Sequence, residues 1–231
     1  MGFETAKLLS QKGNKVLILG RTAETLHQAA ALLPNTIALP CDITKPDEVD
    51  NLLALLATDY ADLSVLVNNA GKAFVYTHAE GVDAIEKARQ EMDTNYFALI
   101  RLTEKLLPVL KKQSEAAIVN VSSIVAFTPA SIIPAYSDSK AAVHSNTLTL
   151  RHTLAKDTSI CVFELMPPTV NTAFSKDIGG EAHGMPAEEV AQGLINGLES
   201  DTYEIYVGLT TTFRDYFFAN PAEAFNLLNM A

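Results

Sequence analysis

The stretch that decides the fold of this chain is AIVNVSSIVAFTPASIIPAYSDSK, residues 117–140. Its first five residues are mostly β-branched and apolar, which predicts a buried parallel strand over 117–121. A loop is expected up to Pro134, and a helix from there to about Lys156. Ser123 therefore comes just after the carboxyl end of a strand, which is where open α/β sheets bind their ligands.

Tyr136 and Lys140 are four residues apart in this predicted helix, so their side chains are expected on one face. A phenol has an ordinary pKa of about 10, which is too high for proton exchange at neutral pH. We expect the fixed positive charge of Lys140 to lower the pKa of Tyr136. Ser123 would then hold the substrate oxygen that accepts or releases the proton. Because a Tyr–Lys pair at this spacing also arises by chance, the surrounding motifs decide its meaning.

Strands and helices alternate along the chain. Strands are predicted at 15–19, 36–40, 65–67, 117–121, 160–165 and 203–207, and helices at 3–12, 22–33, 45–57, 84–112, 135–156 and 186–198. Such alternation predicts a parallel sheet with helices on both faces. The strand at 65–67 ends in Asn68-Asn-Ala-Gly71, small residues that let the backbone approach a flat ligand closely.

Composition excludes several classes of protein. A chain of 231 residues with 48% hydrophobic content fits one α/β domain over residues 1–231. A net charge of -10 argues against nucleic-acid and anionic-membrane partners. No apolar run reaches the roughly 18 residues of a membrane span, and no signal peptide is recognised. Cys41 and Cys161 are assigned to buried strands as reduced thiols of a cytoplasmic protein, and no His spacing suggests a metal.

Together, Asn68-Asn-Ala-Gly71, Asn95, Ser123 and Tyr136-x-x-x-Lys140 resemble the short-chain dehydrogenase/reductase superfamily over essentially the whole chain. Within it, Met166-Pro-Pro-Thr-Val-Asn-Thr172 and the tail near Pro221 are similar to the DltE-like oxidoreductases of bacteria. The resemblance implies a Rossmann-like fold, which is an α/β fold with a doubly wound parallel sheet. It also implies hydride transfer between a nicotinamide cofactor and a small carbonyl or alcohol substrate.

The resemblance gives each matching residue a role. Tyr136 is the general acid-base, Lys140 lowers its pKa and binds the cofactor ribose, and Ser123 orients the substrate oxygen. Asn95 is expected to bend the main chain of its helix and hold a relay water, the alternative being a solvated surface Asn. The region 174–185 is expected to form a mobile substrate lid.

A cofactor site is implied as well. Arg21 directly follows a predicted strand, and its guanidinium suits a ribose 2′-phosphate, which predicts NADP with NAD as the alternative. The alternative is that Arg21 is a solvated loop residue that binds no ligand. Asp42 is expected at the adenine or as the N-cap of the next helix. The other cofactor-binding residues implied are Gly2, Ile43, Asn69, Ala70, Gly71, Tyr136, Lys140, Pro167, Val170 and Thr172.

The first residues depart from the family pattern. Gly2 matches the last glycine of the Gly-rich phosphate loop, and the preceding strand and two glycines are absent from the sequence. The expected fold is therefore an N-terminally truncated Rossmann-like sheet, whose loss of a central strand leaves two neighbours with unpaired edges. One interpretation is an enzyme whose start lies upstream. The alternative is a non-catalytic relative that keeps the fold and self-associates without dinucleotide. A homodimer or homotetramer is expected through the helices of Asn95 and Tyr136.

Overall fold

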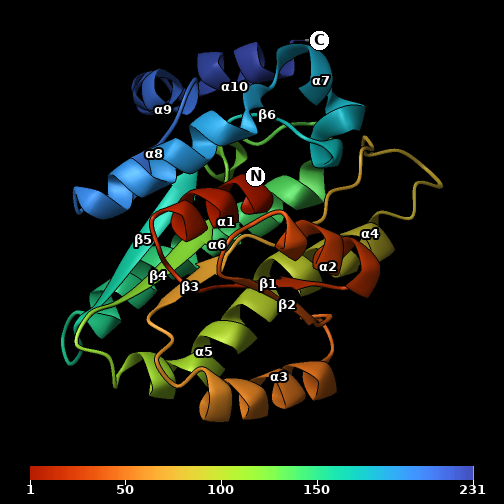
Figure 1. Cartoon of the computed structure of the whole chain (residues 1–231). Helices are drawn as coiled ribbons and strands as arrows, with labels where there is room; N and C mark the ends of the chain where they lie inside the picture. Colours follow the sequence, from red (N-terminus) through yellow and green to blue (C-terminus); the bar gives the residue numbers. More distant parts are fainter. Residues whose placement is uncertain (231) are drawn as a thin grey trace.

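The structure, a computed structural model, describes residues 1–230 (Figure 1). Its strands are β1 (Val16–Gly20), β2 (Thr36–Pro40), β3 (Val65–Asn68), β4 (Ala116–Val121), β5 (Ile160–Met166), β6 (Val170–Asn171), β7 (Met185–Pro186) and β8 (Glu204–Tyr206). Its α-helices are α1 (Gly2–Gln11), α2 (Ala23–Ala31), α3 (Pro46–Asp59), α4 (Ala84–Met92), α5 (Ala98–Leu110), α6 (Pro134–Leu154), α7 (Gly180–His183), α8 (Ala187–Glu199), α9 (Thr210–Ala219) and α10 (Pro221–Asn229). A π-helical turn, η1 (Asp93–Phe97), joins α4 to α5, and η2 (Ile124–Ala126) and η3 (Ala173–Ile178) are 3₁₀ turns.

All strand pairs are parallel, as alternation of strands and helices predicts. β3, β4, β5 and β8 form one sheet in that order, with Val67 opposite Val119 and Val119 opposite Phe163. β1 pairs with β2 in a separate ladder, and β6 pairs with β7 in a short one. Within residues 1–230, β1 has no partner other than β2, and β3 has none other than β4. β1 and β3 therefore each have one edge without a strand partner in this part of the chain.

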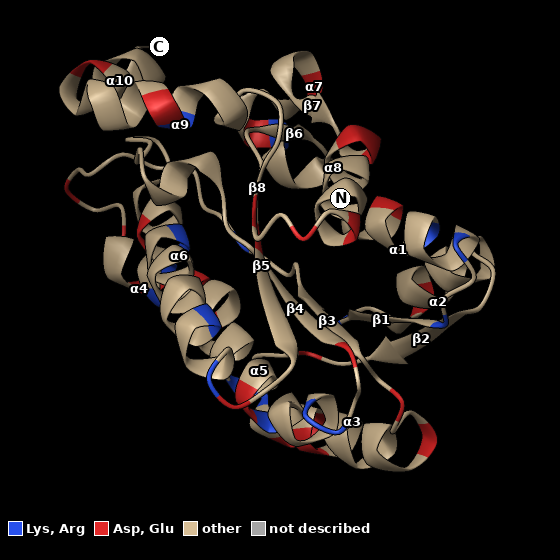
Figure 2. Cartoon of the chain, turned by 90° about the vertical axis from the view of Figure 1, so that its left-hand side faces the viewer, with Lys and Arg blue, Asp and Glu red and all other residues tan. Residues whose placement is uncertain are grey.

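Side chains alternate between the two faces of the sheet, as the two-residue period of a strand requires. On β4, Ile118 packs with α3, α5 and α6 in one apolar cluster. Val119 and Val121 point the other way, into a cluster that includes Val190 and Leu194 of α8. Helices thus cover both faces (Figure 2), which confirms the doubly wound α/β, Rossmann-like fold.

Most element boundaries lie within two residues of those predicted, because they rest on local signals. Gly13, with a φ of 89°, follows the end of α1, and Pro46 is the first residue of α3. Several details differ from these expectations or add to them. The helix predicted over 84–112 is interrupted by η1, and α9 and α10 were not predicted. The segment 174–185, expected to form a lid, contains most of η3, all of α7 and the first residue of β7. Cys41 is buried, but Cys161 is only half-buried.

No helix in residues 1–230 is both long enough and apolar enough to cross a membrane.

Candidate active site

Predicted site residues follow the carboxyl ends of five parallel strands. Arg21 follows β1, Asp42 follows β2, Asn69 follows β3, Ser123 follows β4, and Pro167 follows β5. In a parallel α/β sheet these ends form the crevice where ligands bind. The fold therefore arranges residues far apart in sequence along one edge.

Ser123, Tyr136 and Lys140 come together at the end of β4. The Ser123 hydroxyl hydrogen-bonds the phenol of Tyr136 and also accepts the N–H of Val125 at 3.3 Å. Nζ of Lys140 lies 5.5 Å from the centroid of the Tyr136 ring, consistent with two residues one helical turn apart. The same Nζ donates a hydrogen bond to the carbonyl oxygen of Val121, the last residue of β4, at 2.7 Å. The three side chains thus lie together, with Ser123 and Lys140 buried and Tyr136 half-buried.

The expected net lowering of the Tyr136 pKa is not found in this structure. Burial raises the pKa of Tyr136 well above its ordinary value, and the hydrogen bond with Ser123 offsets only part of that rise. Burial also lowers the pKa of Lys140 to about 8, while the Glu164 carboxylate acts in the opposite direction. The physical reason is that both groups leave water together, and Nζ bonds the main chain of β4.

Asn95 is buried in η1, with 1% of its surface exposed, so it is not a solvated surface residue. Its Oδ1 accepts the backbone N–H of Lys72 at 2.7 Å, and its Nδ2 donates to the backbone oxygen of Lys72 at 2.9 Å. Nδ2 also donates to Oγ of Ser139 at 2.8 Å. The side chain therefore ties the loop after β3 to α6, while the π-turn interrupts the regular helix at this residue.

Gly71 lies where three parts of the chain converge. A Cβ at Gly71 would lie 3.6 Å from Oδ1 of Asn95, 3.9 Å from the Phe174 ring and 4.0 Å from Nζ of Lys140. The Phe174 ring, in η3, also packs on Tyr136, with ring centroids 5.7 Å apart. The absence of a side chain at Gly71 keeps the space beside Lys140 open. Phe174 was not singled out from the sequence, because only the lid segment as a whole gave a signal.

Gly2, at the start of α1, packs closely against Asn69, the residue after β3. A Cβ at Gly2 would lie 2.7 Å from Nδ2 of Asn69, too near for any larger residue without a shift. Ile43, Ala70 and Asn95 line a small hollow that also includes residues Asn68, Thr94, Leu99 and Val121. The start of α1 thus lies against the residue that follows β3, and β3 pairs with β4, the strand that leads to Ser123.

Arg21 and Asp42 face one another at the ends of β1 and β2. Burial alone would raise the pKa of Asp42, but hydrogen bonds from Thr44 and the charge of Arg21 lower it overall. The Thr44 hydroxyl donates at 2.7 Å and its N–H at 3.0 Å. Asp42 therefore shapes the turn into α3, whose N-cap is Lys45, so the N-cap alternative for Asp42 is wrong. The Arg21 side chain is exposed.

The segment after β5 contacts the residues that follow Ser123. The carbonyl oxygen of Pro167 accepts the N–H of Ile124, next to Ser123, at 3.0 Å. Val170 is buried in β6, and the Thr172 hydroxyl donates to the Val170 oxygen at 3.5 Å just before η3. These contacts place the predicted Pro167, Val170 and Thr172 between Ser123 and Phe174 along the edge of the site.

The sequence profile described as short chain dehydrogenase matches residues 1–182, most of the chain. The chain belongs to the short-chain dehydrogenase/reductase family. It is 38% identical over 209 residues to the uncharacterized oxidoreductase DltE of Bacillus subtilis (strain 168), an alignment covering 89% of this chain and 82% of that relative. This confirms the DltE-like resemblance and makes the chain an enzyme of the oxidoreductase class.

Solved structures agree with this membership. A short chain dehydrogenase from Burkholderia cenocepacia J2315 in complex with NADP is 26% identical, with a TM-score of 0.85 over 100% of this chain and 92% of that one. A short chain dehydrogenase/reductase from Burkholderia phymatum in complex with NAD has a TM-score of 0.87 over 99% of this chain and 91% of that one. At 18% identity the second likeness shows the fold alone.

Two residues of this short-chain dehydrogenase, one buried and one half-buried, were not identified from the sequence. Glu164 lies in β5 and is 0% exposed, and His144 on α6 hydrogen-bonds it at 2.9 Å. The available signal was a single acidic residue within the otherwise apolar run ICVFELM, since a buried charge requires a partner. A further hollow, lined by Gly13, Lys15, Leu33, Asn35, Thr36 and Ile37, lies at the amino ends of β1 and β2, away from the site.

Proposed function

We propose that this enzyme transfers hydride between a nicotinamide dinucleotide and the carbonyl or alcohol carbon of a small molecule. The observation that carries the proposal is the meeting of Ser123, Tyr136 and Lys140 beside Gly71 and Asn95. An acid-base hydroxyl, a buried ammonium and an open backbone at one strand end are the parts that such chemistry needs.

The residues present fit a dinucleotide, and we propose NADP rather than NAD. Arg21 offers an exposed guanidinium at the end of β1, and guanidinium groups bind phosphate in a bidentate manner. Asp42 and Ile43 follow the neighbouring strand, where a base would lie beside the ribose site. The Burkholderia cenocepacia relative, a complex with NADP, supports the same assignment. Gly71 brings the backbone after β3 close to Lys140 and Asn95 without a side chain in between.

When bound, the nicotinamide supplies the hydride that reaches the carbonyl carbon during reduction. Ser123 donates a hydrogen bond to the carbonyl oxygen, and the phenol of Tyr136 gives that oxygen its proton. Lys140 stabilises the resulting phenolate with its positive charge. The main chain of Asn95, within its π-turn, holds a water through which the lost proton is replaced. In alcohol oxidation Tyr136 accepts the proton instead.

The surroundings of Tyr136 favour a hydrophobic substrate. Its ring packs against an apolar cluster and against Phe174. The cluster contains Ile124, Val125, Ile133, Phe213 and Ala224, with Phe127, Ala130, Ile178, Tyr216, Phe217 and Leu228 packed on it. Because these neighbours of the Tyr136 ring are apolar, we infer a carbonyl compound with an uncharged, apolar flank.

The second candidate is a non-catalytic relative that self-associates without dinucleotide. The interruption of the sheet between β1 and β3 favours it, because α1 begins beside this gap.

Titration of this chain with NADPH and NADH separates the two candidates. The fluorescence of the reduced nicotinamide and isothermal calorimetry report binding without requiring a substrate. Saturable binding, together with NADPH-dependent reduction of a hydrophobic aldehyde or ketone, supports the oxidoreductase. A folded chain that binds neither dinucleotide at about 1 mM, the weak end of specific binding, rejects it.

A further inference from the structure

Glu164 is a buried carboxylate in the middle of an apolar strand. Along β5, Phe163 and Leu165 pack on the α8 face, so Glu164 points to the opposite face, which α6 covers. Its exposed fraction is 0%. Because a buried charge is costly unless it is paired and hydrogen-bonded, the partners of Glu164 indicate what it does.

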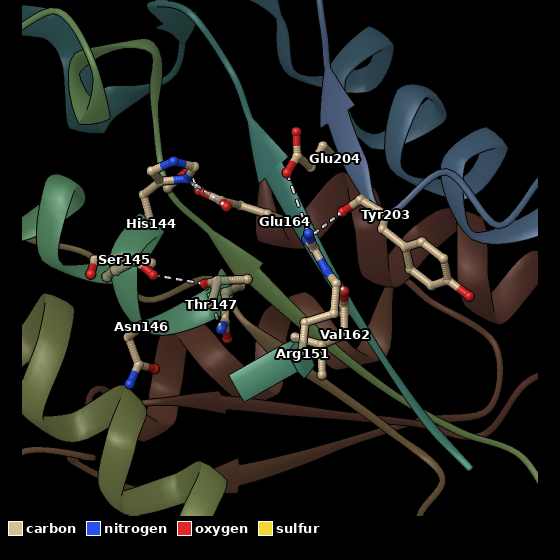
Figure 3. A network of polar contacts seen from close by, with 12 residues as sticks. His144, Ser145, Asn146, Thr147, Arg151, Val162, Glu164, Tyr203 and Glu204 are labelled. Atoms are coloured by element: carbon tan, nitrogen blue, oxygen red, sulfur yellow. Dashed lines mark hydrogen bonds and ion pairs between the residues drawn. The ribbon is translucent and has the colours of Figure 1, made fainter. Parts of the chain in front are cut away.

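Two groups bind this carboxylate directly. Nδ1 of His144, on α6, lies 2.9 Å and 3.1 Å from the two carboxylate oxygens of Glu164 (Figure 3). The hydroxyl of Ser122, at the end of β4, donates a hydrogen bond to one of them. The Glu164 hydrogen bond raises the pKa of His144 above its ordinary value, since it favours the imidazolium. One carboxylate thus joins β4, β5 and α6.

The other charged groups in this network have partners of their own. Arg151, further along α6, bonds Glu204 of β8 at 3.3 Å (Figure 3). The hydroxyl of Tyr206 donates to the second oxygen of Glu204 at 2.6 Å. Glu164 therefore has His144 as its charged contact, and its charge also acts on Lys140, one helical turn earlier on α6.

Lys140 is the group that most needs a counter-charge. It is 3% exposed and forms no ion pair in the part of the chain described, residues 1–230. Its Nζ donates to the carbonyl oxygen of Val121, which directly precedes Ser122. Burial lowers the pKa of Lys140 to about 8, and the charge of Glu164 opposes this lowering. With a weaker counter-charge the pKa of Lys140 would fall further, and the ammonium would lose its proton close to neutral pH.

We propose that Glu164 and His144 are positioning residues of the reaction proposed above. The Glu164 carboxylate is the counter-charge of Lys140 and fixes Ser122, the neighbour of Ser123, while His144 satisfies the carboxylate from the solvent side. The assignment of Ser123 and Lys140 to the reaction rests on the proposed function. The electrostatic coupling between Glu164 and Lys140 needs neither cofactor nor substrate.

Substitution of Glu164 by Gln tests the coupling with the least change in shape. The amide keeps an acceptor for Ser122 but removes the charge. The full chain, carrying ¹³C at the lysine ε-carbons, is titrated by NMR, and the Lys140 signal is identified by its loss in Lys140→Arg. We expect the Lys140 titration midpoint to fall by about one pH unit. Glu204→Gln, which breaks the neighbouring ion pair with Arg151, is the matched control and should leave the midpoint in place. An unchanged midpoint in Glu164→Gln overturns the proposal.

A second measurement keeps the proposal testable if Glu164→Gln does not fold. Lys140 and His144 act on the same Glu164 carboxylate, so on the proposal the loss of the Lys140 charge also shifts the titration of His144. In Lys140→Met the imidazole signal, identified by its loss in His144→Gln, should titrate at least about 0.3 pH unit higher, because a repelling cation is gone. A His144 midpoint that stays in place overturns the coupling.

Activity provides a separate readout. In an active parent, the alkaline limb of the kcat profile should move down in Glu164→Gln together with the Lys140 midpoint, whereas a purely structural role would lower kcat equally at every pH. A parent without dinucleotide-dependent activity rejects the proposed function. The two NMR titrations then still decide whether Glu164 and Lys140 are coupled.

Discussion

Glu91 in α4 is a buried carboxylate whose charge acts on Tyr136. Its titration should make the free energy of unfolding depend on pH. It is 0% exposed, Oε1 accepts the N–H of Phe74 at 2.7 Å, and Oε2 has no partner among residues 1–230. Burial raises the pKa of Glu91 to about 6, with the Phe74 bond acting against it and the charge of Asp138 adding to it. The charge of Glu91 in turn raises the pKa of Tyr136.

The magnitude follows from the difference between the folded and unfolded pKa. A rise from 4.5 to about 6 is about 1.5 units, which at 1.36 kcal/mol per unit corresponds to about 2 kcal/mol. Because the pKa is raised in the folded state, the folded chain binds more protons than the unfolded chain between these values. The free energy of unfolding therefore falls by about 2 kcal/mol as the pH rises from below 4.5 to above 6.

Glu91→Gln isolates this contribution, because Gln keeps an acceptor for Phe74 but cannot ionise. Urea unfolding is measured for parent and variant from about pH 4 to about pH 8, and the difference in unfolding free energy is taken at each pH. This difference cancels the contributions of groups that titrate equally in parent and variant. The variant should gain about 2 kcal/mol relative to the parent across this range. Glu86→Gln, an exposed residue of the same helix, should show a flat difference.

A parent–variant difference that stays constant within about 0.5 kcal/mol over the whole range would refute the reasoning. Glu91 would then titrate with an ordinary pKa, and its burial would not oppose its charge.

The remaining predictions concern the proposed reaction and assembly. Tyr136→Phe should lose at least about a hundredfold of carbonyl reduction while still binding NADPH, with Tyr60→Phe as the control; activity within about twofold of the parent removes Tyr136 from the mechanism. Arg21→Asp should reverse a preference for NADPH over NADH, because a carboxylate repels the 2′-phosphate; a parent that binds both equally contradicts the role of Arg21. Light scattering at micromolar concentration should give a homodimer or homotetramer, weakened by Leu148→Asp on α6, where Leu148 is 40% exposed; a monomeric parent argues against pairing through α5 and α6. A chain extended before Met1 by a β-branched strand and Thr-Gly-x-x-x-Gly should bind the dinucleotide at least about tenfold more tightly, because β1 and β3 each keep an open edge; equal affinity of both chains speaks against this.

Local patterns were sufficient for most of the strands and helices. Strands such as Val65–Asn68 and Ile160–Met166 are short apolar runs, and Gly13 and Pro46 mark helix ends through backbone restrictions of their own. The placement of Arg21, Asn69 and Ser123 after successive strands follows from the rule that parallel strands share one carboxyl edge. Each of these inferences needs only residues that are neighbours in the sequence and the spacing of apolar residues, which repeats every 2 residues in a strand and every 3.6 in a helix.

The tertiary structure decided what depends on contacts across the chain. Burial reversed the expected direction of the Tyr136 pKa, because desolvation of the ring outweighs its polar neighbours. Asn95 uses its side chain on the backbone of Lys72, a partner that no local signal identifies. Glu164 is a counter-charge only because β5 turns it toward α6, one helical turn from Lys140. Electrostatic energies in a protein interior depend on distance and burial, and only the folded chain sets these.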